Sequence, residues 1–192
     1  MTSRRVIALA VLVALLQIGF LSWIIAGRAT VLRNGPQAVL KVEPVDPRDL
    51  LRGDYVRMGY DISRIPMKLI TNLPLGDDQV PGGVIMVRVG KDADGYWRAR
   101  SASLGEPANG PAAGELDIRG VTGAIWRADP DADVFVTYGI ERFYVPEGQG
   151  LQIEQDLNVR SFGVAVALAA DGTPQIKALL DGDVPVYEEP PY

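Results

Sequence analysis

The chain has 192 residues, of which 47% are hydrophobic, and a formal net charge of −5 at pH 7. It contains no cysteine and no histidine, which excludes disulfides, zinc sites and Cys–His or Ser–His catalysis, and we expect no cofactor and no metal. All 24 acidic residues follow residue 29, so that part carries 16 basic against 24 acidic residues, a formal charge of −8. This balance argues against nucleic acid and anionic lipid headgroups as main partners.

The first predicted element is a membrane-spanning helix over residues 6–26. The run has no charged residue, and about 20 apolar residues at a rise of ~1.5 Å cross the ~30 Å hydrocarbon core. We expect residues 1–5 to be a cytoplasmic stub and residues 27–36 a linker. A short basic stub before an apolar run is typical of a signal-anchor in the bacterial inner (cytoplasmic) membrane, with the C-terminal domain in the periplasm. A cleaved signal peptide is the alternative, although its apolar region is usually only ~7–15 residues long.

Residues 37–187 are predicted to form one extracytoplasmic, mainly β domain. Short apolar runs alternate with Gly- and Pro-rich turns, which is typical of an antiparallel β sandwich or small barrel. Alternation predicts strands over residues 38–42 and 116–121, the second continuing to residue 126. The other expected elements are a weak strand or helical turn over 68–70, loops over 75–83 and 105–114, one short helix over 147–157, and a disordered tail over 188–192.

Two segments of this domain, residues 55–64 and 133–142, resemble each other without a gap between the matched positions. Each then reaches an Asp-Gly turn between alternating apolar runs, at residues 94–95 and 171–172, and this is the strongest short hairpin signal. We expect two similar halves, residues 37–105 and 115–182. Two unrelated hairpins with the same turn chemistry are the alternative. The matched pairs are Val56 with Val134, Tyr60 with Tyr138, Ile62 with Ile140, and Arg64 with Arg142.

The densest group of charges lies between residues 43 and 60, close behind the predicted anchor. Asp and Arg side chains at this spacing can form two-pronged ion pairs, which would fix the loop and give it a purely structural role. The functional interpretation is a rigid loop that presents charges and aromatic rings to a binding partner near the membrane. Both interpretations remain open at this point.

Residues 44–60 resemble the signature of the GDYXXLXY-motif family of bacterial membrane-anchored proteins. The motif corresponds to Gly53, Asp54, Tyr55 and Tyr60, while Met58 stands where the family has Leu, and residues 142–148 are similar to the family's second block. The resemblance implies an anchored extracytoplasmic domain, often linked with polytopic membrane proteins, and brings no established catalytic residues. The candidate binding residues of the two blocks are Asp46, Arg48, Asp49, Arg52, Gly53, Asp54, Tyr55, Tyr60, Arg142, Tyr144 and Glu147.

We therefore expect a non-catalytic accessory or assembly partner of another envelope membrane protein. One alternative is an envelope hydrolase acting on glycan or peptide through a carboxylate pair, such as Asp54 with Glu147 or Glu154. Another is a small-ligand sensor that uses Trp97 and Trp126. No Ser–Lys spacing is diagnostic of a protease, and residues 129–133 lack the later Gly and Glu of a calcium-binding loop.

Overall fold

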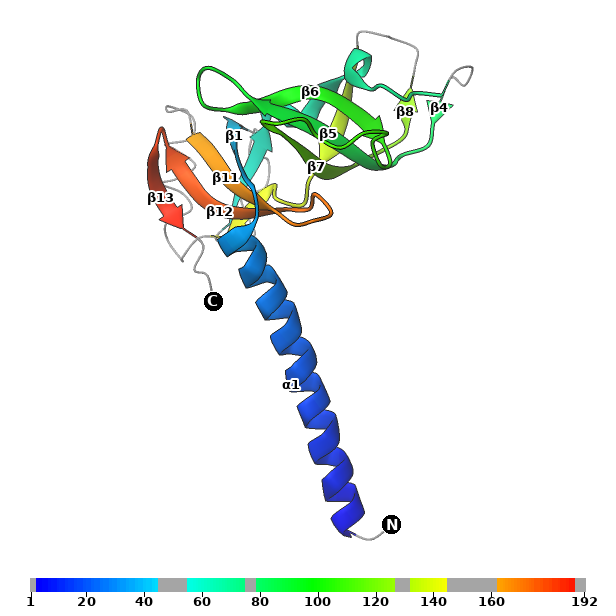
Figure 1. Ribbon diagram of the computed structural model, residues 1–192, viewed down its shortest axis with the longest axis vertical. Helices are drawn as coiled ribbons and strands as arrows, with labels where there is room; N and C mark the ends of the chain where they lie inside the picture. The colour runs from blue at the N-terminus through cyan, green and yellow to red at the C-terminus, as the bar shows by residue number, and fades with distance from the viewer. Residues whose placement is uncertain (1–2, 45–54, 75–78, 127–131, 145–161, 189–192) are drawn as a thin grey trace.

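The computed structural model consists of one long N-terminal helix and a β head (Figure 1). It describes residues 3–44, 55–74, 79–126, 132–144 and 162–188. Helix α1 (Ser3–Asn34) is long and apolar enough to cross a membrane. Its side chains from residue 4 to residue 28 are exposed, whereas Ala29 and Leu32 are buried against the head. The stretch expected as a linker is therefore helical as far as Asn34, because the last turns of α1 pack on the head.

The described part of the head contains two main antiparallel sheets and one small pair. The six-stranded sheet has the order β10-β2-β1-β11-β12-β13, the five-stranded sheet has the order β3-β9-β7-β5-β6, and β4 pairs with β8. The strands are β1 (Gln37–Pro44), β2 (Tyr55–Tyr60), β3 (Arg64–Pro66), β4 (Gln79–Val80), β5 (Gly83–Lys91), β6 (Trp97–Leu104), β7 (Glu115–Thr122), β8 (Ile125–Trp126), β9 (Asp133–Thr137), β10 (Arg142–Tyr144), β11 (Phe162–Leu168), β12 (Pro174–Asp181) and β13 (Val184–Glu188). Two short 3₁₀ helices follow β2 and β3, η1 (Asp61–Ser63) and η2 (Met67–Leu69).

The prediction of a mainly β head behind one apolar helix is confirmed, and the sheets are open rather than closed into a barrel. The predicted strands over residues 38–42 and 116–121 lie in β1 and β7, but residues 125–126 form β8 in the separate pair, because Gly123 interrupts the alternation. Residues 68–70 include part of η2, and the expected loop over 75–83 contains β4. The helix expected over 147–157 lies outside the described residues.

The two halves of the head share five equivalent strands, which pair in the same register. Strands β1, β2 and β3 of the first half recur in the second half as β7, β9 and β10, and β5 and β6 recur as β11 and β12. Leu40 faces Val164 in the β1–β11 pair, and the equivalent residues Ile118 and Val87 face each other in the β7–β5 pair. Even the register shift recurs, after Arg88 in β5 and after Ala165 in β11. The register is equivalent at every pair that has a counterpart, which means that the halves share one fold, whereas the β12–β13 and β4–β8 pairs have no counterpart.

The two halves also exchange strands. In the six-stranded sheet, β1 and β2 of the first half lie between β10 and β11 of the second half. In the five-stranded sheet, β7 and β9 of the second half lie between β3 and β5 of the first half. The buried side chains of both sheets form one hydrophobic cluster, so neither half has a core of its own.

Candidate functional site

The structure describes four of the eleven candidate binding residues. Tyr60 and Arg142 are described with their side chains, whereas Tyr55 and Tyr144 are described as strand residues only. The remaining seven lie outside the described residues: Asp46, Arg48, Asp49, Arg52, Gly53, Asp54 and Glu147.

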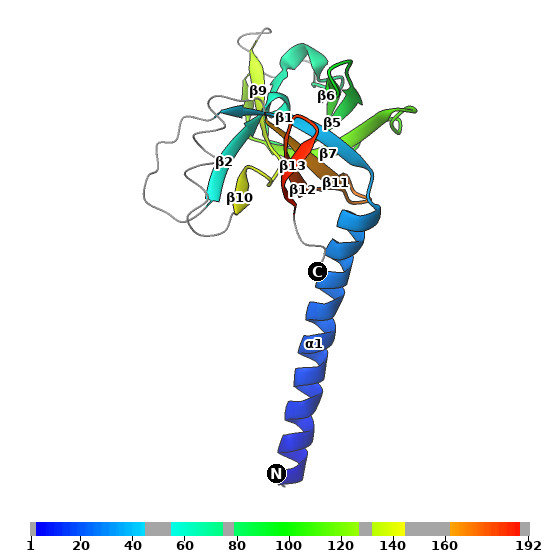
Figure 2. The same ribbon diagram turned by 90° about the vertical axis from the view of Figure 1, so that its left-hand side faces the viewer.

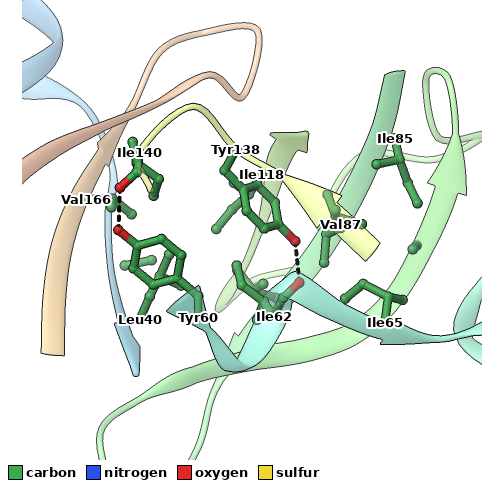
Figure 3. Close-up of a cluster of buried hydrophobic side chains, with 14 of the residues drawn as sticks. Leu40, Tyr60, Ile62, Ile65, Ile85, Val87, Ile118, Tyr138, Ile140 and Val166 are labelled. Carbon is green, nitrogen blue, oxygen red and sulfur yellow. Dashed lines mark hydrogen bonds between the residues drawn. The ribbon is translucent and has the colours of Figure 1, made fainter. Parts of the chain in front are cut away.

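Tyr60, the last residue of the signature, lies in the core and not on a surface. Its side chain is 1% exposed, and its hydroxyl donates a 2.7 Å hydrogen bond to the carbonyl oxygen of Ile140. Tyr138, its counterpart in the second half, donates a 2.6 Å hydrogen bond to the carbonyl oxygen of Ile62 (Figure 3). Ile140 is the counterpart of Ile62, so the two bonds are equivalent and cross between the halves.

The residues around these tyrosines repeat the same symmetry. The backbone N–H of Tyr60 donates to the Ser63 hydroxyl, and the backbone N–H of Tyr138 donates to the carboxylate of Glu141, the residue equivalent to Ser63. Burial raises the pKa of both phenol groups, so both hydroxyls remain protonated donors. Met58 is also buried, which confirms that its position requires an apolar side chain. This end of the signature therefore joins the two halves.

The two sequence blocks meet at one edge of the six-stranded sheet. Strand β10 pairs antiparallel with β2, so that Tyr144 faces Tyr55 and Arg142 faces Arg57. Both strands lie on the side of the head from which α1 projects (Figure 2). This sheet edge, on the anchor side of the head, is therefore built from the first block of one half and the second block of the other.

A polar cluster follows directly after Tyr60. The Asp61 side chain is 18% exposed and lies 3.7 Å from the Arg98 guanidinium, and one of its oxygens is buried with no hydrogen-bond partner. Arg98 also pairs with Asp92 and Asp94 at the β5–β6 turn, where Arg100 binds Asp92 at 2.8 Å. Burial raises the pKa of Asp61 to about 6, and the Arg98 charge only partly opposes this effect. Sequence reasoning missed this cluster. The sequence feature that could have indicated it is a difference between the aligned halves, where Asp61 in the first half corresponds to Gly139 in the second.

The raised pKa of Asp61 predicts that the free energy of unfolding depends on pH in a specific way. Its folded pKa of about 6 lies above the ordinary value of 3.8, so the folded state retains the proton longer, and a rise in pH through this window favours unfolding. Relative to Asp61→Asn, the natural protein should lose about 1–3 kcal/mol of unfolding free energy between pH 4 and pH 7. Denaturation of both proteins across this range measures the difference. Asp183→Asn, at an exposed turn, is the control, and equal slopes for Asp61→Asn and the natural protein would contradict the assignment.

Two cavities lie on either side of residues 106–109, and only the larger one borders α1. The larger, about 710 Å³, has walls from α1 (Thr30, Val31 and Asn34), from the β11–β12 turn and from residues 106–111. The smaller, about 450 Å³, lies on the other side of residues 106–109 and has polar walls that include Thr71, Asn72 and Arg88. Both volumes lie within the range of ligand-binding cavities.

The residues of the alternative functions lie apart from these cavities or outside the described residues. Neither Trp97 nor Trp126 lines either cavity, and Trp126 is 63% exposed on β8. Asp54, Glu147 and Glu154, the proposed carboxylates of a hydrolase, lie outside the described residues. Among the described residues, no group of three or more acidic side chains is placed to hold a metal ion.

The fold defines the class of protein. It is a β head of two main sheets, whose two halves exchange strands, and it follows an N-terminal helix long and apolar enough to anchor it in a membrane. The family model described as "GDYXXLXY protein" matches residues 17–179. The chain therefore belongs to the GDYXXLXY family, as its motif blocks predicted. No curated protein and no solved structure matches it significantly.

Proposed function

We propose that this chain is a single-pass protein of a bacterial cytoplasmic membrane whose periplasmic head is an accessory or assembly partner of a polytopic membrane protein. The observation that carries the proposal is the junction of α1 and the head. The side chains of residues 4–28 are covered by no other part of the described chain, whereas Ala29 and Leu32 are buried in the head. Such a helix needs lipid or other transmembrane helices around it, and its packed end holds the head at the bilayer surface.

The features on the anchor side of the head favour binding of a membrane protein rather than of a soluble substrate. The paired edge of β2 and β10 and the larger cavity both lie on the anchor side of the head. Arg28 and Arg33 after the apolar run nearly balance Arg4 and Arg5 before it, so orientation rests on the short basic stub, which is typical of a signal-anchor with a cytoplasmic N-terminus. A protein that emerges from the same bilayer would meet this side of the head first.

Co-isolation of the intact protein in mild detergent tests the proposal. We expect a polytopic membrane protein to remain bound, and expect Arg52→Ala or Asp54→Ala to reduce its recovery roughly tenfold, as the loss of an important interface side chain does. The thermal unfolding of both variants should be unchanged. Asp183→Ala, at the exposed turn before β13, is the control and should retain the partner. Recovery of nothing above background would refute the accessory role.

A further inference from the structure

The two halves differ most clearly in the segment that follows β6 and β12. Both strands end at a glycine with positive φ, Gly105 at +69° and Gly182 at +61°. After Gly182 the chain turns back as β13 and pairs with β12, where Tyr187 packs edge-on against Phe143 at 5.0 Å. In the first half the position of Tyr187 is taken by Gly110, which has no ring to bury.

Residues 106–111, the counterpart of β13, do not pair with β6. The outer edge of β6 is instead bound by the chain after η2: the backbone N–H of Thr71 donates to Ala102, and the side chain of Asn72 bonds both the N–H and the carbonyl of Leu104. Residues 106–111 are thus displaced from the sheet edge, and they form a wall of both cavities.

An ion pair within the five-stranded sheet, which the six-stranded sheet lacks, holds this displaced segment. Arg88 binds the carboxylate of Asp117 through two nitrogens, at 2.7 and 2.8 Å, and also donates to the carbonyl oxygen of Asn109. The equivalent positions in the six-stranded sheet are Ala165 of the second half and Val39 of the first half, which form no ion pair. The displaced segment and the ion pair beneath it therefore occur together at the five-stranded sheet alone. There the displaced segment lies across a cavity from the end of α1.

The larger cavity has an apolar floor and acidic walls. Three carboxylates line it, from Glu106, Asp117 and Asp171, whereas no Lys or Arg is among its lining residues. The positive charge of Arg88 compensates the negative charge of the Asp117 carboxylate, and Arg119 lies near Asp171. Glu106, in contrast, is exposed and forms no ion pair in the described structure. Hydrogen bonds from Thr173 lower the pKa of Asp171, so this carboxylate stays charged. The cavity therefore favours a ligand that combines apolar groups with a positive charge.

We propose that the larger cavity binds an extended segment of the membrane partner, in which a Lys or Arg beside apolar side chains leaves the bilayer next to α1. This proposal rests on the accessory role and names the chemistry of its contact. The acidic walls would bind the basic side chain, and the apolar floor, which includes Met86, Leu116 and Leu168, would bind its neighbours. A polypeptide fits better than a soluble ligand, because one wall is the C-terminal end of α1 itself, which follows the apolar run of residues 6–26.

The symmetry of the head supplies matched control positions for the test. Ala170 lines the cavity at the β11–β12 turn, and its counterpart Ala93 is equally exposed at the β5–β6 turn but lines neither cavity. Figure 1 shows the β5–β6 turn on the side of the head away from α1. Likewise Glu106 in the cavity wall corresponds to Asp183 at the exposed turn before β13.

A photo-crosslinking residue at position 170 or 93 of the full-length protein, in its native membrane, gives the test. We expect adducts at position 170 only, mapping to a stretch of a membrane protein with Lys or Arg beside a transmembrane segment. Glu106→Lys should reduce them about tenfold, as a like-charge contact at an interface does, and Asp183→Lys should leave them unchanged.

Four results would overturn the proposal: equal adducts at both positions, adducts with lipid, adducts with a second copy of the chain, or a yield that Glu106→Lys does not change. A polytopic protein that co-isolates without an adduct at position 170 would refute the cavity contact alone. If the chain is absent from the membrane fraction, or no membrane protein co-isolates with it, the accessory role fails as well.

Discussion

Replacement of Tyr60 by alanine is expected to lower the free energy of unfolding of the head by about 3–5 kcal/mol. The ring is 1% exposed within the core that both sheets share, and its hydroxyl bonds Ile140 in the other half. The substitution therefore leaves a cavity and removes the donor from a buried carbonyl group. Denaturant unfolding of the intact protein in detergent, followed by tryptophan fluorescence, measures the loss.

Phenylalanine at position 60 separates the hydrogen bond from the packing. Tyr60→Phe leaves the Ile140 carbonyl without its donor, which costs about 1–3 kcal/mol for a buried acceptor. Tyr138→Phe should cost a similar amount, because its bond to Ile62 is the symmetric equivalent. Tyr96→Phe is the control, since this ring is half-buried, and its effect should stay within about 0.5 kcal/mol. If Tyr60→Phe were as neutral as Tyr96→Phe, the crossed pair would not join the halves.

Division of the chain between residues 110 and 111 is expected to give two fragments that fold only together. Residues 1–110 alone retain the β1–β2 and β5–β6 pairs, but lose β11 beside β1 and β7 beside β5. Isolated two-stranded pairs are marginally stable in water. Residues 111–192 keep the β11–β12–β13 sheet but lose the first-half side chains that complete its core, so we expect neither fragment to unfold cooperatively by itself. Mixed or co-expressed, they should recover the strand signal in circular dichroism and a single cooperative transition.

The complementation experiment has an internal check. Tyr60→Phe in the first fragment should weaken reassembly, because its hydrogen bond crosses between the fragments. A cooperative unfolding transition of residues 1–110 on their own would contradict the exchange of strands. So would a pair of fragments that fold separately and do not bind each other.

The repeat in the sequence predicted the equivalence of the halves but not the exchange of strands. Alignment of the halves with a single gap matches the Asp-Gly turns and the tyrosines correctly. Alternating apolar residues determine which face of a strand is buried, but they do not determine its neighbour in the sheet. Leu40 of β1 is equally compatible with many β partners, and its pairing with Val164 follows from the arrangement of the whole head.

The charged sites were harder to predict for a related reason. Asp61 begins the 3₁₀ helix η1 and Arg88 lies in strand β5, and in the sequence nothing local distinguishes these two charges from solvent-exposed ones. They stand out only when the sequences of the two halves are aligned, because Asp61 then corresponds to Gly139 and Arg88 to Ala165. The helical conformation of residues 27–34, within the expected linker, was not predicted either, because it accompanies contacts of Ala29 and Leu32 with the head that the local sequence does not reveal.

The central claim is that α1 and the head act as one body at the bilayer surface and bind a membrane partner there. Insertion of a flexible linker of about ten Gly and Ser residues between Asn34 and Gly35 tests it most directly, because such a linker leaves both parts intact but separates them. Co-isolation of the intact protein from membranes is the measurement. We expect the lengthened protein to remain in the membrane with a folded head, and its recovery of the polytopic partner to fall at least about tenfold. Undiminished recovery would contradict the claim, because the position of the head on its helix would then be irrelevant to the partner.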